Sequence, residues 1–395
     1  MSGKLRVVVL GMVGRMPLAG MAWQALHYLE GLRRLGWDVY YVEDTGDWPY
    51  DPERNTITDD CRYAVDYLAR VMGWGGLGDR WAYRAPAPDS RTFGLSESRL
   101  AAVWASADAL INLCGATVLR DEHLRVPVRV YLETDPVLRQ IEVAEGCRRT
   151  IRQLGAHTHL FTYGANLGAP DCPVPLGPFR YHATRPPVIL DWWPAGSSAG
   201  GARRRPLRFT TVSTWRQSGK DVTWHGETFL WSKHGEFLKL LELPRRTGQA
   251  LELALAGNNA EATGLLTAGG WSVVHALRLS KEIVSYRDYI RGSRGEFTVA
   301  KDQYVRLKTG WFSDRSVCYL AAGRPVVLQE TGFSKFLPTG KGLFAFRTLD
   351  EILGAFEAIN ADYDGNARAA RDIAQSYFAA ERVVAGLLER AGHRG

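Results

Sequence analysis

The chain has 395 residues, of which 46% are hydrophobic and 11% aromatic, and its formal net charge is +7. This composition excludes a disordered chain, and the length indicates two domains rather than one. No apolar run reaches the roughly 18–20 residues that a membrane span needs. Because most Lys and Arg residues are interspersed with acids, we expect small anionic ligands and no nucleic acid as partners.

The N-terminus and the cysteines indicate the compartment. The opening stretch "MSGKLRVVVLG" leads directly into an apolar strand without a small-residue cleavage site, so no signal peptide is expected. The five cysteines are an odd number, widely scattered and without a C-x-x-C motif. These features are typical of reduced thiols and predict a cytoplasmic protein.

The first half of the chain alternates strand and helix patterns. Residues 5–10 form an apolar strand, a glycine-bearing loop covers 11–20, a helix is expected over 22–35, and a second strand over 37–44. Further buried strands are expected at 107–113, 128–134 and 158–163. Strands that alternate with helices predict a parallel sheet with right-handed crossovers.

A Gly/Ser-rich stretch at 191–206 ends in a charge run and is the best linker in the chain. The strand pattern restarts after it, at 207–213, 250–257, 270–276, 295–300 and 324–329, and residues 349–392 have a helical pattern. We therefore predict two α/β halves with a ligand cleft between them. The expected domains are 1–190 and 207–366, with a C-terminal helical segment at 367–395.

The loop "GMVGRMPLAG" carries Gly14 and Arg15 between the first strand and the first helix. Backbone N–H groups at such a position favour anions, although the dinucleotide pattern G-x-G-x-x-G is absent. A plain tight turn that packs the helix on the sheet explains the glycines equally well. His27, within the following helix, either faces the cleft or is a core histidine.

Arg216 and Lys220 lie four residues apart in a polar loop that follows the first strand of the second half. The loop is no P-loop, since Thr214 replaces the first glycine and Asp221 the Ser/Thr. Fixed positive charge is nevertheless what a diphosphate leaving group needs when no metal is present. A solvated basic turn is the alternative.

Two pairs of potential metal ligands lie on strands, His157 with His159 and Glu133 with Asp135. Neither pair has a third ligand nearby in the sequence, so we expect no metal. The chain also lacks the G-x-S-x-G and H-E-x-x-H motifs of common hydrolases.

The stretch "TGWFSDRSVCYLAAGRPVVLQETGF" at 309–333 places polar residues before a short apolar helix. Ser313, Asp314 and Ser316 are N-cap candidates, and Gly323 ends the helix. A helix N-terminus with a polar loop suits a phosphate or sugar hydroxyls.

This stretch resembles the donor domain of the GT-B glycosyltransferases, in which many retaining members carry E-G-F-G-x-x-x-x-E-A-x-A-x-G-x-P-V. The matching positions are Phe312, Ala321, Gly323, Pro325 and Val326. The two family glutamates fall on Gly310 and Cys318, so that pair is absent. Arg315 stands where a subset of related enzymes has an arginine.

The resemblance implies a GT-B fold with two Rossmann-like domains and a role for several residues. It assigns Arg216, Lys220, Asp314, Arg315 and Ser316, together with Gly14 and Arg15, to the donor phosphate or sugar. The glycine loop would also shape the acceptor side. Glu296, Lys301 and Asp302 are the nearest substitutes for the missing glutamates, and His275 lies where the family reads the base.

The resemblance therefore implies a metal-independent enzyme that transfers a hexose or heptose from a nucleotide diphosphate sugar to a small-molecule acceptor, with no other cofactor. The expected enzyme is a monomer or homodimer of bacterial specialised metabolism. An inverting reaction needs a general base, for which the candidates are His27, Glu133 and Asp135. The alternatives are a nucleotide-sugar epimerase of the same fold and a non-catalytic nucleotide- or sugar-binding protein.

Overall fold

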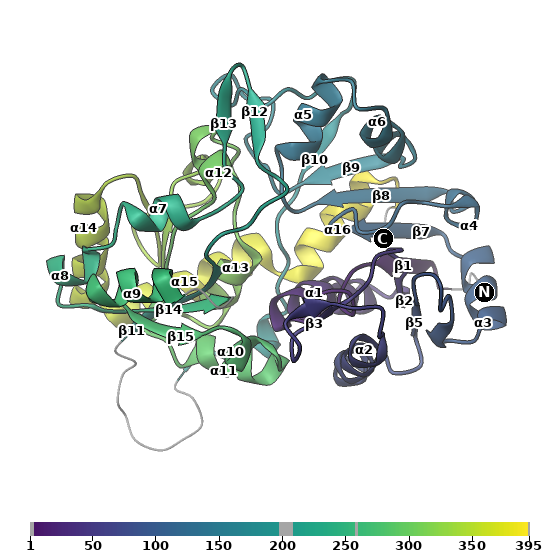
Figure 1. Ribbon diagram of the computed structural model, residues 1–395, viewed down its shortest axis with the longest axis horizontal. Helices are drawn as coiled ribbons and strands as arrows, with labels where there is room; N and C mark the ends of the chain where they lie inside the picture. The colour runs from purple at the N-terminus through teal and green to yellow at the C-terminus, as the bar shows by residue number, and fades with distance from the viewer. Residues whose placement is uncertain (1–3, 197–207, 257–259, 394–395) are drawn as a thin grey trace.

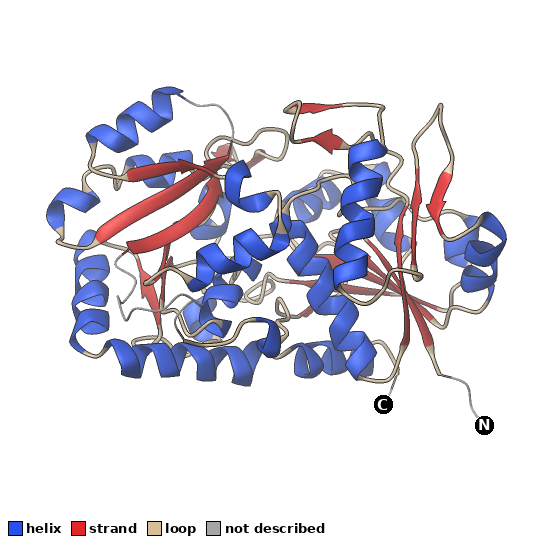
Figure 2. Ribbon diagram, turned by 90° about the horizontal axis from the view of Figure 1, so that it is seen from below, coloured by secondary structure: helices blue, strands red, loops and turns tan. Residues whose placement is uncertain are grey.

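The computed structural model describes residues 4–196, 208–256 and 260–393. Two sheets of mainly parallel strands lie side by side, each covered by helices (Figures 1 and 2). Residues 197–206 of the predicted linker lie outside the described residues. Among the described helices, none is long and apolar enough to cross a membrane.

The first sheet has the strand order β10-β9-β8-β7-β1-β2-β5-β6, and all neighbours except β5 and β6 pair in parallel. Its strands are β1 (Arg6–Leu10), β2 (Asp38–Glu43), β5 (Trp81–Arg84), β6 (Thr92–Gly94), β7 (Ala109–Leu113), β8 (Val128–Glu133), β9 (His159–Thr162) and β10 (Tyr181–Ala183). Its helices are α1 (Ala19–Arg34), α2 (Arg62–Trp74), α3 (Glu97–Ala105), α4 (Asp121–Leu124), α5 (Leu138–Ala144) and α6 (Arg148–Gly155). A small antiparallel pair, β3 (Tyr50–Asp51) and β4 (Thr56–Ile57), lies apart from this sheet.

The second sheet is wholly parallel, with the order β15-β14-β11-β16-β17-β18. Its strands are β11 (Arg208–Thr214), β14 (Ala250–Ala256), β15 (Ser272–His275), β16 (Gly295–Thr298), β17 (Val326–Gln329) and β18 (Leu343–Phe346). Its helices are α7 (His234–Leu238), α8 (Leu243–Arg246), α9 (Ala260–Ala268), α10 (Leu277–Ser280), α11 (Ile283–Arg291), α12 (Asp302–Arg306), α13 (Asp314–Ala321) and α14 (Leu349–Ala361). A hairpin of β12 (Val222–Trp224) and β13 (Glu227–Phe229) follows β11.

The C-terminal segment crosses back from the second half to the first (Figure 1). It consists of α15 (Tyr363–Ile373), a π-helical turn η3 (Ala374–Phe378) and α16 (Ala380–Arg390). Val384 and Leu387 of α16 are buried in the same core cluster as α1 and β1. A Cβ at Gly31 of α1 would lie 3.1 Å from that of Ala380, so glycine permits this close helix packing.

The central strands are short apolar runs because both of their faces are covered. Val7, Val8 and Val9 of β1 are fully buried, as are Leu110 and Ile111 of β7. Since the carboxyl ends of parallel strands meet at one edge, the loops that follow β8, β11 and β16 come together where the two halves meet.

Candidate functional site

A group of basic residues lies where the second half faces the first. Lys220 is in the loop after β11, Lys233 immediately precedes α7, Lys301 follows β16, and Arg315 is in the first turn of α13. Of these, Lys233 and Lys301 are only 7% and 8% exposed. We refer to Lys220, Lys233, Lys301 and Arg315 as the basic cluster.

Asp135, which follows β8 in the first half, bridges to two of these lysines. Its carboxylate lies 2.8 Å from Nζ of Lys301 and 3.8 Å from Nζ of Lys220, and it accepts a hydrogen bond from the Tyr304 hydroxyl. Although burial opposes its ionisation, these lysines hold the pKa of Asp135 well below its usual range. The carboxylate therefore joins the two halves as a fixed anion.

Trp231 packs against both lysines that Asp135 binds. Nζ of Lys301 lies 4.1 Å and Nζ of Lys220 4.5 Å from the centre of its ring. An ammonium group over an indole face is stabilised by the ring quadrupole, so Trp231 holds the two charges close together.

Lys233 differs from its neighbours because its ammonium group makes no hydrogen bond or ion pair within the described part of the chain. Burial, together with the nearby Arg315 and Lys301, places the pKa of Lys233 well below its ordinary value. The carboxylates of Glu296 and Asp135 act in the opposite direction but form no ion pair with it, so a bound phosphate oxygen would favour the charged amine further. Sequence reasoning missed this residue.

Arg315 is enclosed by a polar network inside the second half. Its guanidinium pairs with the carboxylate of Glu296, donates to the carbonyl of Val212 at 2.7 Å and to Oγ1 of Thr298 at 3.0 Å. Glu296 is fully buried, and its Oε2 atom has no hydrogen-bond partner in the described residues. Arg315 therefore neutralises and orients Glu296, which leaves one carboxylate oxygen available.

The first turn of α13 carries polar side chains that do not cap the helix. Of the three N-cap candidates in the sequence, Ser313 occupies the N-cap position, but its side chain makes no capping hydrogen bond. Ser316 is fully buried, and its Oγ lacks a partner among the described residues. Asp314 is half-buried beside Gln24 of α1, and burial raises the pKa of its carboxyl.

The glycine loop of the first half is held by a carboxylate of its own. Glu43, at the end of β2, accepts the backbone N–H groups of Gly14, at 2.7 Å, and of Arg15. Burial raises the pKa of Glu43 to about 7 despite these bonds. The side chain of Arg15 pairs with Asp47 at 2.9 Å, so both candidates already have anionic partners.

His27 lies in an aromatic cluster and is 2% exposed. Its Nδ1 lies 3.1 Å from the backbone N of Ile189 and its Nε2 3.2 Å from Nε1 of Trp193, and its ring stacks on Trp23. Burial lowers the pKa of His27 to about 3. These contacts fit the core-histidine interpretation, and we do not carry His27 into the proposed reaction.

Three further candidates from the sequence, Asp302, Arg216 and His275, lie outside the basic cluster. The carboxylate of Asp302 accepts the backbone N–H of Leu230 at 2.9 Å, which fixes the loop that leads to Lys233. Arg216 is exposed in the loop after β11. His275 is exposed at the end of β15, two strands from β11.

Comparisons with solved structures identify the architecture. An α-glucosyltransferase in complex with UDP-glucose and DNA containing an abasic site aligns over 99% of this chain and 100% of its own, at 10% identity and a TM-score of 0.59. The GT-B glycosyltransferase fold is thus confirmed.

Two further structures with the GT-B fold extend the comparison. HepE from Anabaena, in complex with UDP and glucose, covers 98% of this chain and 99% of its own, at 12% identity and a TM-score of 0.54. AviGT4, a glycosyltransferase involved in avilamycin A biosynthesis, covers 98% and 97%, at 13% identity and a TM-score of 0.50. No protein-family model and no curated protein matches the sequence.

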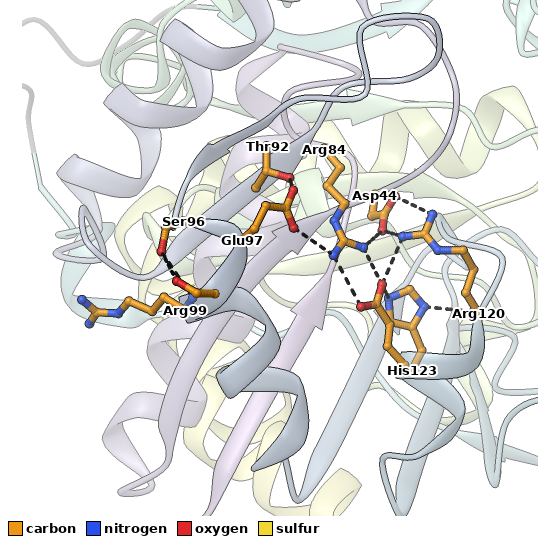
Figure 3. Close-up of polar contacts among 10 residues, drawn as sticks. Asp44, Arg84, Thr92, Ser96, Glu97, Arg99, Arg120 and His123 are labelled. Atoms are coloured by element: carbon orange, nitrogen blue, oxygen red, sulfur yellow. Dashed lines mark hydrogen bonds and ion pairs between the residues drawn. The ribbon is translucent and has the colours of Figure 1, made fainter.

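A second polar network lies in the first half of this GT-B fold, at the ends of β2 and β5 (Figure 3). Asp44, Glu122 and His123 lie close enough together to hold a metal ion. Arg84 and Arg120 already pair with both carboxylates, however, and Nδ1 of His123 accepts the backbone N–H of Arg120 at 3.1 Å. The ring proton is then on Nε2, so these residues form an ion-pair network rather than a metal centre.

Glu133 is a buried carboxylate that makes the stability of the protein depend on pH. It accepts hydrogen bonds from Gln140 and from Oγ1 of Thr162 at 2.7 Å, yet burial raises its pKa to about 7. Since its folded-state pKa lies above the unfolded value of 4.5, the protein loses stability as the pH rises from about 4.5 through 7.

Between pH 4.5 and pH 8.5 we expect the free energy of unfolding to fall by about 3 kcal/mol more in the wild type than in Glu133→Gln, because each pKa unit corresponds to about 1.4 kcal/mol. Urea unfolding at the two pH values measures it. Glu357→Gln, at an exposed position on α14, is the control. Equal pH dependence in Glu133→Gln and the wild type would show that folding does not raise the pKa of this carboxyl.

Proposed function

We propose that this protein is a nucleotide-sugar-dependent glycosyltransferase that moves a hexose or heptose to a small-molecule acceptor. The observation that carries the proposal is the basic cluster at the carboxyl ends of β11 and β16, in which the buried amine of Lys233 has no partner within the described residues. The cluster lies where the second half of a GT-B fold meets the first.

Glycosyl transfer from a nucleotide diphosphate sugar releases a diphosphate, on which negative charge develops as the bond to the sugar breaks. The negative charge of the donor would favour the protonated form of Lys233, and Lys233 and Lys301 would then stabilise the departing diphosphate from a low-dielectric site. Lys220 and Arg216 would contact the phosphates from the loop after β11. This supplies the role of a divalent cation, so we propose a metal-independent reaction.

The first turn of α13 would bind the other end of the donor. Its backbone N–H groups have no side-chain cap, and the hydroxyl of Ser316 is unpaired within the described chain. Asp314, together with the free oxygen of Glu296, would accept hydrogen bonds from sugar or ribose hydroxyls. These carboxylates would then replace the glutamate pair that the family motif has at other positions.

Asp135 would serve as an anion that the donor displaces. It occupies Lys301 and Lys220, and the cluster behind it is buried, so the two halves must part for a donor to reach Lys233. A diphosphate carries more charge than one carboxylate and would replace it on the lysines. Released from them, Asp135 would face the donor as a candidate general base, beside Glu133.

The solved structures with this fold support a nucleotide-sugar donor but do not identify the acceptor. HepE and the α-glucosyltransferase contain UDP or UDP-glucose, whereas the latter structure also contains DNA. We favour a small-molecule acceptor of specialised metabolism over a nucleic acid. Basic and acidic residues are interspersed here, whereas a nucleic-acid acceptor would favour a concentrated basic face. An epimerase of the same fold would convert the donor sugar without any acceptor, and a binding protein would not turn it over.

The first test is the thermal stability of the protein with UDP, ADP, GDP, CDP or dTDP, each with and without Mg²⁺. We expect one diphosphate to raise Tm by mass action, equally with and without the metal, and to lose most of this effect in Arg216→Ala. Arg306→Ala, which removes a comparably exposed arginine paired with Glu227, should keep it.

Two results would contradict the proposal. If no diphosphate changes Tm, the basic cluster does not bind a nucleotide. If the donor sugar is epimerised without acceptor, or is bound and never consumed with acceptor mixtures, the transferase assignment is wrong.

A further inference from the structure

A cavity of about 260 Å³ lies between α16, η3 and the strands β9 and β10. It is lined by Phe161, Ala165, Ala183, Thr184, Arg185, Phe336, Tyr377, Arg382, Val383, Gly386, Leu387 and Arg390. None of these residues belongs to the basic cluster. Phe336 comes from the second half, so the cavity touches both halves and the segment that joins them.

Three arginines line this cavity, and none of them makes an ion pair with a carboxylate in the described part of the chain. Arg390 donates to the carbonyl of Ala183 at 2.8 Å, and the guanidinium of Arg185 lies 5.6 Å from the centre of the Tyr377 ring. Burial, with Arg390 nearby, lowers the pKa of Arg185. Arg185 is partly buried, whereas Arg382 and Arg390 are exposed at the rim, and three guanidinium groups without carboxylate partners favour a bound anion.

Gly386 provides space between two of these arginines. Positions 382, 386 and 390 are spaced four apart, so they lie along one face of α16. A Cβ at Gly386 would meet no atom within 4 Å, so no packing contact requires glycine there. Glycine within a helix is unfavourable by about 0.5–1 kcal/mol relative to alanine, and the gain here is open volume in the cavity.

Aromatic side chains supply the rest of the cavity wall. Phe161, Phe336 and Tyr377 come from β9, the segment after β17 and the π-helical turn, respectively. Such turns interrupt α-helices frequently at functional sites. The volume lies just below the 300–1,000 Å³ range that is typical of small-molecule sites.

We propose that this cavity is a second ligand site, which binds a small phosphomonoester that carries a flat ring. Arg185 and its neighbours on α16 hold the phosphate, since guanidinium groups match phosphate oxygens in geometry and charge. The ring lies against Tyr377 and Phe336. Because the ligand would contact both halves and η3, its binding would restrain their relative motion.

The test is isothermal titration calorimetry of the full chain with phenyl phosphate, with inorganic phosphate and neutral phenol as comparisons. We expect saturable binding of phenyl phosphate, weaker binding of inorganic phosphate, and none of phenol. Arg185→Gln should raise the phenyl phosphate Kd about tenfold or more, since hydrogen bonds to charged groups contribute that much. Gly386→Leu, which fills the cavity, should abolish binding.

Matched controls are available on neighbouring helices. Arg368→Gln, at an exposed site on α15, and Gly354→Leu, at an exposed helical glycine on α14 whose Cβ would also meet no atom, should leave the Kd unchanged. The proposal is overturned if phenyl phosphate does not bind. It is equally overturned if Lys233→Met removes the binding while Arg185→Gln and Gly386→Leu do not.

Discussion

Replacement of Lys233 with methionine is expected to lower kcat/KM for glycosyl transfer by about 10²–10³-fold, which is the range for loss of one preorganised hydrogen-bond donor that stabilises a transition state. The same change should leave the protein as stable as before, or more stable. Lys233 is 7% exposed and makes no ion pair within the described chain, so methionine removes a buried polar amine and keeps the packed volume. Steady-state rates and urea unfolding of one preparation measure both effects.

The opposite directions of these two effects distinguish a catalytic lysine from a structural one. Lys341→Met is the control, because Lys341 is 61% exposed and pairs with the exposed carboxylate of Asp362 at 3.4 Å. It should change neither quantity appreciably. If Lys233→Met unfolds at lower urea concentration and keeps its rate, the amine stabilises the fold and does not act on the donor.

Replacement of Arg315 with methionine is expected to have the largest effect on stability, about 3–5 kcal/mol. It would leave the fully buried carboxylate of Glu296 without its partner and the carbonyl of Val212 without a donor. Proteins of this kind have total stabilities of roughly 5–15 kcal/mol, so the second half should unfold at much lower urea concentration.

A second substitution shows whether the uncompensated carboxylate is the cause. Glu296→Gln in the Arg315→Met background removes that charge and should restore much of the lost stability without restoring transfer activity. Arg306→Met, which breaks the exposed pair with Glu227, should cost less than about 1 kcal/mol. A similar loss in the double and the single variant would refute the explanation.

The architecture could be predicted from the sequence because the central strands are short apolar runs between helical patterns. The expected strands at 5–10, 37–44 and 128–134 correspond to β1, β2 and β8 to within one residue at each end. The sequence patterns did not predict β3–β6, β10, β18 or the hairpin β12–β13. Each of these strands is only two to four residues long, so its hydrophobic pattern is too short to be identified, even where, as in β5 and β18, the strand is mostly buried.

The candidate site was predicted less completely, because its contacts join residues that are distant in the chain. Lys220 and Lys301 lie far apart in the chain and come together at Asp135, which belongs to the other half. Asp135 was predicted as a catalytic candidate from its strand pattern, but its ion pair with Lys301 spans 166 residues. Arg315 was predicted as a ligand contact, and the structure directs its guanidinium to Glu296 instead. None of these pairings leaves a local signal.

The close packing of α16 on α1 has a consequence for the synthesis of the chain. Val384 and Leu387, close to the C-terminus, belong to the core cluster that contains β1 and α1. On the ribosome, N-terminal domains usually fold before later ones emerge. Here the first half exposes part of its apolar surface until α16 has left the exit tunnel, long after β1 and α1. Completion of the half that is made first therefore depends on a helix that follows the whole second half, and deletion of α16 would impair it.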